Sequence, residues 1–408
     1  MTEAADRTPP AGAANVVIVG GRRGTWSEVE AIPDPPPVAA HLVEDNVAAL
    51  RAVWSQLLGR GEMLLATAGR VDDTLAEELR ADGFALVHPE SVTPPTKRRP
   101  AESGRVWLLT SGSTGRPKRV AHTLATLSTV TGDQPPRRWL CAYSPGAYAW
   151  WQVVTLSLGH PGQDVLFVEQ ADLDRWPDIA LAEGVTAVSG TPTFWRQALW
   201  RSSATVAALP LRQVTLGGEP VDQVILDRLA ELFPQARISW IYASSEAGAT
   251  IAVHDRRAGF PVEWLDRASP GRPRLAVADG ELVIDSPWSA GGMAGPIRTG
   301  DRVEVGDGRV RITGRLATDE INVGGSKVSA AGVRSVLLEH PAVAWAQVRG
   351  RRAPLVGQMV VAEVVLSGDV PPEDLSRWCA ERLPDYAVPR RVRVLAEIPI
   401  KETLKSDV

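Results

Sequence analysis

The sequence predicts an α/β fold: a large N-terminal domain of layered α/β subdomains with a small β-rich subdomain, followed by a small α+β domain. Three observations predict it. Short apolar runs alternate with stretches of helical spacing up to about residue 246. Residues 253–315 are instead rich in Gly, Pro and Asp between short alternating strands. From residue 316 onward the pattern becomes a compact mixture of helices and strands.

The N-terminal elements follow from local patterning. Residues 1–14 are expected to form a disordered tail, since they show no apolar periodicity. Between the strand-like apolar runs, helical spacing predicts helices. The strands are expected at 15–19, 63–67, 85–88 and 106–110, and the helices at 42–57 and 71–81. The segment 91–103 is proline-rich and basic, which is typical of a surface linker.

The C-terminal elements are read in the same way. Short strands at 281–284, 302–305 and 310–312 define the β-rich subdomain at 253–315. Beyond it we expect helices at 331–339 and 372–382, and strands at 343–348, 359–366 and 391–394. The change of pattern places a domain boundary near 315–319. The chain is therefore divided into an N-terminal domain at 15–315 and a C-terminal domain at 316–408.

Composition and charge limit the class of function. The chain has 408 residues, enough for two or three domains with their own cores. Its net charge of −4 argues against a general nucleic-acid binder, which needs a basic surface. No apolar run reaches the roughly 18 residues of a membrane span, and the N-terminus lacks the pattern of a secretion signal. Cys141 and Cys379 cannot form a disulfide framework, so we expect a cytoplasmic protein.

Lysine is scarce in this chain. Arginine supplies nearly all of the positive charge, and the five lysines are Lys97, Lys118, Lys327, Lys401 and Lys405. A planar guanidinium cannot replace a compact ammonium at a tight site, so a lysine retained against this bias is favoured where an ammonium is needed. This favours Lys118 and Lys405 as functional residues, with Lys401 as the alternative to Lys405 and Lys327 as a support of its glycine turn.

The most specific motif is the loop Thr110–Lys118, with the sequence TSGSTGRPK. It follows a predicted strand, and its glycines and hydroxyls can present N–H and O–H donors to phosphate oxygens, while Lys118 adds a positive charge. The spacing is not that of a Walker A loop, which excludes a P-loop kinase or NTPase. A flexible polar turn is the alternative, and the Pro-Lys ending argues against it.

Six further motifs follow in order: LGGEP at 216–220, YASSE at 242–246, RTGD at 298–301, GR at 314–315, INVGGSKV at 321–328 and PIKETLK at 399–405. With the first loop they resemble the ordered signature of the ANL superfamily of adenylate-forming enzymes, which includes acyl- and aryl-CoA synthetases, peptide-synthetase adenylation domains and luciferases. A single short motif is not specific, whereas seven in the same order are. The resemblance extends from Thr110 to Lys405.

The resemblance implies ATP- and Mg²⁺-dependent activation of a carboxylic acid to an acyl-AMP, with release of pyrophosphate. The acyl group then passes to a thiol, of coenzyme A in first place or of carrier-protein phosphopantetheine. The implied catalytic residues are Lys405, Lys118 and Glu246, and the metal ligands are Glu246 and Thr114. The implied nucleotide-binding residues are Thr110, Ser111, Gly112, Ser113, Thr114, Gly115, Gly217, Gly218, Glu219, Tyr242, Ala243, Ser245, Asp301 and Arg315.

These residue types suit the implied chemistry. Attack of a carboxylate on an α-phosphate brings two anions together, so cations must lie on the phosphates and a metal must neutralise the leaving pyrophosphate. A carboxylate such as Asp301 can accept hydrogen bonds from both hydroxyls of a ribose. The simpler alternatives are a turn residue for Asp301, a charge at a helix N-terminus for Glu246 and a solvated tail residue for Lys405.

The acid is expected to contact side chains that the resemblance places around its pocket, namely Tyr148, Trp150, Trp151, Ser189, Thr193 and Gly248. Aromatic walls favour an aryl or short acyl acid over an amino acid, although such aromatic residues can equally belong to the core. The resemblance further implies that the C-terminal domain is mobile. It would rotate about a hinge at Asp319 and bring the Gly324–Gly325 loop to the active site for the acceptor step.

The sequence also departs from the family pattern. The phosphate loop begins at Thr110, so the resemblance implies a compact member with a trimmed N-terminus, and Leu404 stands where glycine usually precedes the catalytic lysine. These departures motivate a second hypothesis, a degenerate nucleotide-binding homologue without turnover. The retention of Lys118, Glu246, Asp301, Arg315 and Lys405 weighs against it. Amide formation or another non-thiol acyl transfer is a further alternative for the second step.

Overall fold

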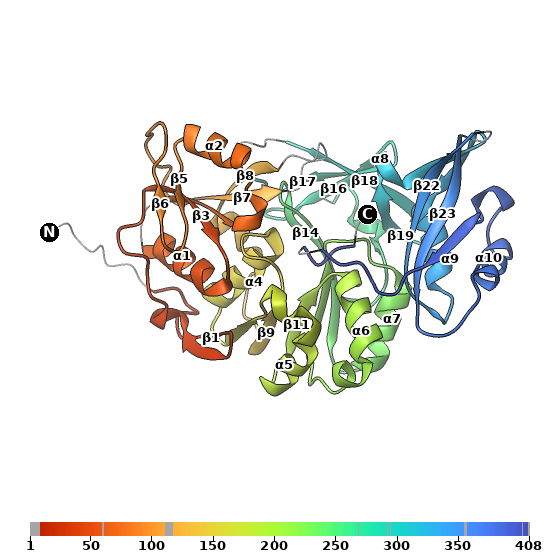
Figure 1. Cartoon of the computed structure of the whole chain (residues 1–408), viewed down its shortest axis with the longest axis horizontal. Helices are drawn as coiled ribbons and strands as arrows, with labels where there is room; N and C mark the ends of the chain where they lie inside the picture. The colour runs from red at the N-terminus through yellow and green to blue at the C-terminus, as the bar shows by residue number, and fades with distance from the viewer. Residues whose placement is uncertain are drawn as a thin grey trace.

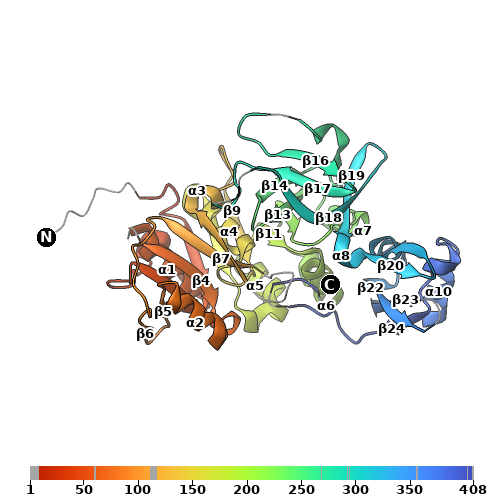
Figure 2. The ribbon, with the colours of Figure 1, turned by 90° about the horizontal axis from the view of Figure 1, so that it is seen from above.

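The computed structural model describes residues 9–58, 61–110, 117–267, 269–291, 293, 295–354, 357–401 and 403–406. Figure 1 shows the chain running from N-terminal α/β layers, through a central lobe, to a separate C-terminal unit. The chain end then returns to the middle of the molecule beside α6, which Figure 2 shows from a second side. Among the described residues, no helix is long and apolar enough to cross a membrane.

The first sheet has six strands in the order β6-β5-β3-β4-β7-β8. Its strands are β3 (Val38–Val43), β4 (Glu62–Thr67), β5 (Ala85–Val87), β6 (Val92–Thr93), β7 (Arg105–Thr110) and β8 (Lys118–Thr123), and its helices are α1 (Asn46–Leu58) and α2 (Asp73–Ala81). The predicted helix at 42–57 in fact begins at Asn46, because residues 42 and 43 complete the buried strand β3. Leu75 and Leu79 of α2 are buried, and Asp72 caps its first turn by accepting from Leu75 N.

The second sheet has eight strands in the order β14-β13-β12-β11-β9-β10-β1-β2. Its strands are β1 (Val16–Val19), β2 (Arg22–Thr25), β9 (Arg137–Cys141), β10 (Gln163–Phe167), β11 (Ala187–Gly190), β12 (Gln213–Gly217), β13 (Arg237–Ser244) and β14 (Gly248–Val253). Its helices are α3 (Leu124–Leu127), α4 (Tyr148–Gly159), α5 (Trp176–Ala182), α6 (Pro192–Ala207) and α7 (Gln223–Leu232). From β10 to β13 the neighbouring strands are parallel, so their carboxyl ends lie along one edge, where ligands bind in open α/β sheets.

The predicted β-rich subdomain forms a five-stranded sheet in the order β15-β19-β18-β17-β16. Its strands are β15 (Phe260–Pro261), β16 (Arg274–Ala278), β17 (Glu281–Asp285), β18 (Ile297–Gly306) and β19 (Arg309–Arg315). The three strands predicted from the sequence are confirmed, and β18 and β19 are longer than predicted. One hydrophobic core joins this sheet to both α/β sheets, through residues such as Phe260, Leu282 and Val310.

The C-terminal part has a hydrophobic core of its own. It contains α8 (Leu316–Asp319), β20 (Glu320–Val323), β21 (Ser326–Ser329), α9 (Ala330–Leu338), β22 (Val343–Ala353), β23 (Gly357–Leu366), α10 (Pro372–Ala380) and β24 (Arg391–Val394). The predicted helices and strands are confirmed within a few residues, except that β22 continues to Ala353. Short 3-10 helices connect elements throughout the chain, at Trp26–Glu28, Ala68–Arg70, Gln170–Arg175, Val262–Trp264 and Asp385–Ala387.

The two parts also contact each other directly. A small apolar cluster contains Trp345, Val365 and Ile398, with Trp200 of α6 packed against it. Trp200 Nε1 donates to the carbonyl of Leu366 at 3.0 Å. These contacts hold the C-terminal part against α6, and further along the chain Leu404 and Ser406 bond to Thr191 and Glu219, which follow β11 and β12.

Candidate active site

Tyr242 and Asp301 meet between two sheets. Tyr242 lies near the end of β13 and Asp301 in β18, and the Tyr242 hydroxyl donates to Asp301 Oδ2 at 2.5 Å. The β18–β19 register pairs Asp301 with Arg315, whose Nε lies 3.1 Å from Asp301 Oδ1. Burial raises the pKa of Asp301 above its usual value, while the Tyr242 hydrogen bond and the Arg315 charge oppose the shift. The arrangement presents an aromatic ring, a carboxylate and a guanidinium side by side.

Lys405 reaches this group from the C-terminal tail. Its side chain is solvent-accessible, yet protein atoms surround it on most sides, and the reduced hydration lowers its pKa. The charges of Glu219 and Asp301 oppose that shift, and Arg315 adds to it. Lys405 Nζ lies 3.7 Å from the position that a Cβ on Gly218 would occupy. A tail residue and the turn after β12 thus form one site.

The tail is fixed to the N-terminal part by hydrogen bonds on both sides of Lys405. Before it, the Leu404 carbonyl accepts from the Thr191 hydroxyl. After it, Ser406 N and Oγ donate to Glu219 Oε1 at 2.9 and 3.1 Å. Glu219 also accepts from Thr193 N and Oγ1, at 3.0 and 3.1 Å. Glu219, predicted to bind the nucleotide, therefore holds the tail, and Thr193, predicted to contact the acid, bonds to the Glu219 carboxylate.

Leu404 explains one departure from the family pattern. It has a φ of 61°, in the left-handed region that favours glycine, and its side chain is fully buried within the main core. The unfavourable backbone conformation is thus accompanied by apolar burial that a glycine could not provide. The local turn is closed by Lys401, whose N–H donates to the carbonyl of Lys405 at 2.8 Å.

The phosphate loop begins where the sequence predicts. Thr110 ends β7 and Lys118 begins β8, and the two are paired across the antiparallel strands. The predicted residues Ser111, Gly112, Ser113, Thr114 and Gly115 lie outside the described residues. Lys118 is exposed. Glu246, the other predicted metal ligand, lies in the turn after β13, with Ala243 and Ser245 beside it. The described residues contain no cluster of three or more His, Cys, Asp or Glu that could hold a metal.

Of the residues predicted around the acid, Tyr148 and Gly248 do lie together. Tyr148 begins α4, and its hydroxyl is 3.5 Å from the position that a Cβ on Gly248 would take. Burial raises the pKa of Tyr148, so the hydroxyl stays neutral. Trp288, which the sequence analysis missed, lies against the same glycine, and its Cβ is 2.9 Å from that position. Gly248 has a φ of 81°, so a side chain there would be both strained and crowded.

Two other predicted pocket residues lie in the core. Trp150 is fully buried, and its Nε1 donates to Asn46 Oδ1 of α1 at 2.9 Å. Trp151 is also fully buried and packs edge-to-face on Trp150. The prediction that Trp150 lines the acid pocket is therefore replaced by a packing role. Ser189 Oγ lies 3.2 Å from the hydroxyl of Tyr143, a buried residue that the sequence analysis did not assign to the site.

The predicted hinge residue is tied to the C-terminal part. Asp319 ends α8, and its carboxylate accepts from Ser329 Oγ at 3.0 Å and from Ala331 N at 2.7 Å. It therefore caps the start of α9. The hinge role of Asp319 stays a prediction.

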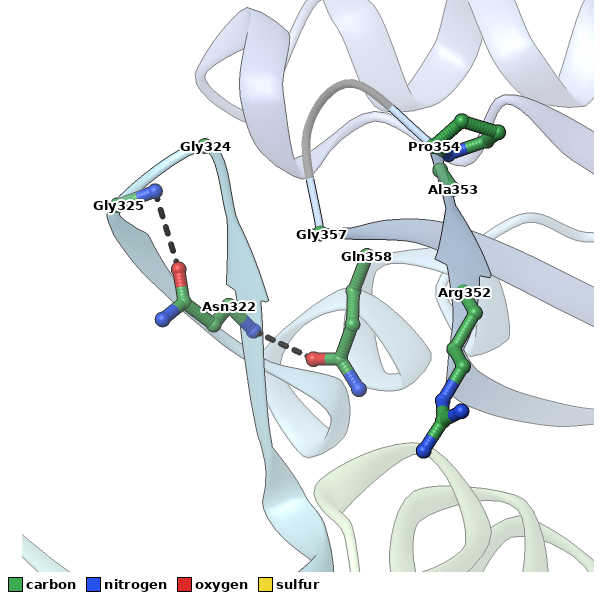
Figure 3. A pocket seen from close by; sticks show the side chains of 8 residues that line it. All are labelled: Asn322, Gly324, Gly325, Arg352, Ala353, Pro354, Gly357 and Gln358. Atoms are coloured by element: carbon green, nitrogen blue, oxygen red, sulfur yellow. Dashed lines mark hydrogen bonds between the residues drawn. The ribbon is translucent and has the colours of Figure 1, made fainter.

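Gly324 and Gly325 form the tip of the β20–β21 hairpin, beside a cavity of about 720 Å³. The cavity is lined by Asn322, Gly324, Gly325, Arg352, Ala353, Pro354, Gly357 and Gln358, as Figure 3 shows. Gly325 N donates to Asn322 Oδ1 at 3.0 Å, and Asn322 N donates to Gln358 Oε1 at 2.8 Å. Arg352 is the charged residue of the described lining and comes from the neighbouring hairpin.

Comparisons with known proteins agree with this arrangement. The family model described as AMP-binding enzyme matches residues 13–292, and the AMP-binding enzyme C-terminal domain matches residues 333–405. A 2-succinylbenzoate–CoA ligase of Bacillus cereus (strain Q1) is 27% identical over 327 residues, which cover 73% of this chain and 67% of the relative.

Solved structures show a similar fold. The amide bond synthetase McbA from Marinactinospora thermotolerans has a TM-score of 0.69 at 22% identity, covering 97% of this chain and 96% of that one. The anthranilate CoA ligase AuaEII, in complex with anthranoyl-AMP, has a TM-score of 0.73 at 17% identity, covering 97% and 93%. The o-succinylbenzoate CoA synthetase (MenE) from Bacillus subtilis, with the acyl-adenylate OSB-AMP, has a TM-score of 0.66 at 19% identity, covering 98% and 96%.

Proposed function

The chain belongs to the AMP-binding enzyme family, and on that premise we propose that it activates an aryl carboxylic acid with ATP and passes the acyl group from the acyl-AMP to the thiol of coenzyme A. It is an acyl-adenylate-forming acid–thiol ligase. The observation that best supports the residue roles is the convergence of Tyr242, Asp301, Arg315 and Lys405 from β13, β18, β19 and the tail.

The nucleotide is held by these four residues. The Tyr242 ring packs on the adenine, and Asp301 accepts hydrogen bonds from the ribose hydroxyls. Arg315 holds the Asp301 carboxylate in place through the 3.1 Å ion pair and opposes the rise in its pKa that burial causes. The Lys405 side chain lies over Gly218, with its Cε 3.1 Å from the position of a Cβ there, and its ammonium would face the α-phosphate of the nucleotide. The site therefore fits an adenine nucleotide.

Catalysis of the first step is a matter of charge and position. The Lys405 ammonium lies where negative charge develops as the carboxylate of the acid attacks the α-phosphate. Lys118 and the loop from Thr110 hold the β- and γ-phosphates. Glu246 and Thr114 would hold Mg²⁺, which when bound supplies positive charge to the leaving pyrophosphate. The reaction needs no nucleophile from the protein.

The acid is aryl because the described groups around Gly248 are aromatic. Tyr148 and Trp288 lie on this glycine, while Tyr143, which follows β9, and Ser189 of β11 contact each other through their hydroxyls at 3.2 Å. A flat ring fits between such walls, with its carboxylate directed to Lys405. Similar enzymes are named for aryl acids, o-succinylbenzoate and anthranilate, and this supports the same class of substrate here.

The two domains have different roles in the reaction. Residues 15–315 bind ATP and the acid, and residues 316–408 carry Lys405. For the second step, bending in α8 removes Lys405 and brings the Gly324–Gly325 loop and Arg352 to the acyl-AMP. Coenzyme A is the acceptor, a carrier-protein phosphopantetheine being the alternative, and the reaction takes place in the cytoplasm.

Pyrophosphate release tests the proposal. ATP and Mg²⁺ are incubated with a panel of aryl, short-chain, fatty and amino acids, with and without coenzyme A, and Lys405→Ala is run in parallel. We expect release that depends on an aryl acid and falls at least 100-fold in the variant, the scale of loss when a group that stabilises transition-state charge is removed. Retained ATP binding without acid-dependent release would indicate the degenerate homologue. Release without an acyl-CoA product would point to another acceptor.

A further inference from the structure

His122 is a fully buried histidine with a hydrogen bond at each ring nitrogen. It lies on β8, four residues after Lys118, and is 1% exposed. Its Nε2 is 2.7 Å from the carbonyl oxygen of Ser245, and its Nδ1 is 3.0 Å from Thr126 Oγ1. Its ring also packs against that of Tyr148, with 5.9 Å between centroids. One side chain therefore touches both the turn after β13 and the wall of the acid pocket.

The partners fix the tautomer. A carbonyl oxygen only accepts hydrogen bonds, so the contact with Ser245 requires a proton on Nε2. Nδ1 of a neutral ring is then an acceptor, and its partner is the Thr126 hydroxyl, which also lies within donating distance of the Thr123 carbonyl at 3.1 Å. Thr126 belongs to α3, directly after β8, and also receives a hydrogen bond from Thr123 N at 3.0 Å. The ring plane is thus set by groups nearby in the sequence, and the Nε2–H points at a turn that is far away in the sequence.

That turn carries the residues assigned to the metal and the adenine. Ser245 directly precedes Glu246 and follows Tyr242 by three positions. A second contact reinforces the first: Ala290 N donates to the Glu246 carbonyl, and Gly291 N donates to the carbonyl of Ala121, the neighbour of His122. β8, the turn at 244–247 and the loop at 289–291 are therefore joined into one unit around Glu246.

We propose that His122 is a positioning residue for the adenylation step: its Nε2–H, bonded to the Ser245 carbonyl, fixes the turn so that the Glu246 carboxylate faces the phosphates. The inference rests on the function proposed above. Because β8 starts at Lys118, the same strand holds both the end of the phosphate loop and the turn with the metal ligand. When the bond is removed, Lys118 and Glu246 are both still present, but their positions relative to each other are no longer fixed.

Two substitutions test the roles of the two ring nitrogens of His122 separately. The carboxamide of glutamine reaches the place of Nε2, and that of asparagine reaches the place of Nδ1. His122→Gln should keep the bond to Ser245, whereas His122→Asn should keep only the contact with Thr126. His254→Leu is the control for loss of a histidine–hydroxyl bond elsewhere, because His254 Nδ1 lies 2.8 Å from Ser239 Oγ of β13.

The readouts are the Mg·ATP concentration that half-saturates pyrophosphate release, the KM for the acid, and the thermal unfolding midpoint. Loss of one buried hydrogen bond corresponds to about a tenfold effect. We expect His122→Asn to raise the half-saturating Mg·ATP concentration about tenfold with an unchanged KM for the acid. His122→Gln and His254→Leu should match the wild-type enzyme. Equal behaviour of Gln and Asn, or an equal rise in the KM for the acid, would overturn the proposal.

Titration calorimetry measures the affinity of the same site for Mg·ATP in the absence of turnover. The wild-type enzyme, His122→Gln and His122→Asn are titrated in the absence of acid. Weaker binding only in the Asn variant supports the positioning role even if no acid in the panel is turned over, so failure of the proposed function remains distinguishable. Equal affinities in all three proteins would count against His122.

Discussion

The side chain of Lys405 passes directly over Gly218: a Cβ at this glycine would lie 3.1 Å from Lys405 Cε. Gly218 has a φ of 82°, so its backbone also favours glycine. The side chain of Lys405 therefore packs against the turn after β12. Access of Lys405 to the site depends on the absence of a side chain at this one position.

Gly218→Ala should accordingly displace Lys405. The added methyl group crowds Cε and adds about 1–2 kcal/mol of backbone strain. We expect pyrophosphate release to fall about 10- to 100-fold, since an ångström-scale displacement of a catalytic group has effects of this size. Gly104→Ala is the matched control: it has a φ of 76° and no neighbour within 4 Å of its Cβ position. Equal activity of the two variants would contradict the contact.

The alkaline limb of the pH–rate profile for adenylation should reflect the deprotonation of Lys405. Reduced hydration lowers the pKa of Lys405 below that of an ordinary lysine. The ammonium is the active form, so the rate of adenylation should be full below the lowered pKa and fall as the pH rises through it, before an ordinary lysine would lose its proton. Lys405→Arg cannot lose its charge in this range, so its residual rate should show no such fall. An unchanged alkaline limb in that variant would assign the titration to another group.

Leu404 should act as an anchor of the tail. Its burial contributes about 2–3 kcal/mol, which outweighs about 1–2 kcal/mol of strain from its positive φ. Leu404→Gly relieves the strain but removes the anchor, so we expect adenylation to slow several-fold while transfer from preformed acyl-AMP to coenzyme A is unaffected or faster. Leu404→Met retains the bulk and should behave like the wild-type enzyme. Single-turnover measurements of each half-reaction distinguish these outcomes.

Arg352 should contribute to the acceptor step alone. It lines the cavity beside Gly324 and Gly325, whereas Arg351 precedes it on β22 and points to the other face of the sheet. Arg352→Ala should raise the KM for coenzyme A several-fold, the size expected for a charge-assisted hydrogen bond, and leave pyrophosphate release unchanged. Arg351→Ala makes the same change of charge and should have no effect. A parallel loss in both variants would indicate nonspecific electrostatics.

The carboxylate of Glu62 makes stability depend on pH. Burial would raise its pKa, but the bidentate contacts with Arg99 at 2.6 Å, with help from Trp107 Nε1 and Glu102 N, lower it overall. Because the folded pKa is depressed, this stabilisation is present above the unfolded pKa and lost as the pH falls through the folded value. Glu62→Gln should cost about 3–5 kcal/mol at pH 7. In thermal unfolding at decreasing pH, the difference from the wild-type protein should shrink.

Much of the fold could be predicted from local pattern. Strands such as β4, β7 and β17 and helices such as α2 and α9 lie within a few residues of the expected ranges, because apolar periodicity and caps such as Asp72 act over neighbouring residues. The start of α1 was predicted four residues early, although Asp45, whose Oδ1 accepts from Ala48 N, is a local capping signal between β3 and α1.

The candidate site could be predicted only in part, for a related reason. Motif spacing points to Tyr242, Asp301 and Lys405, but it does not tell a pocket tryptophan from a core one, as Trp150 shows. His122 and Trp288 belong to none of the motifs, and their importance lies in contacts with Ser245 and Gly248. A histidine four positions after Lys118, within a buried strand, was the one local signal available for His122.

The sequence by itself determined which residues are available and in what order: the phosphate loop, the glycine turns, the YASSE and RTGD motifs and a lysine retained near the end of the chain. Only the tertiary structure decided which of them meet. Ser406 and Glu219 are 187 positions apart and share a hydrogen bond, and Tyr242 and Asp301 are 59 apart. The physical reason is that local propensities act over a few residues, whereas these contacts exist only after separate sheets pack on shared cores and the tail returns to them.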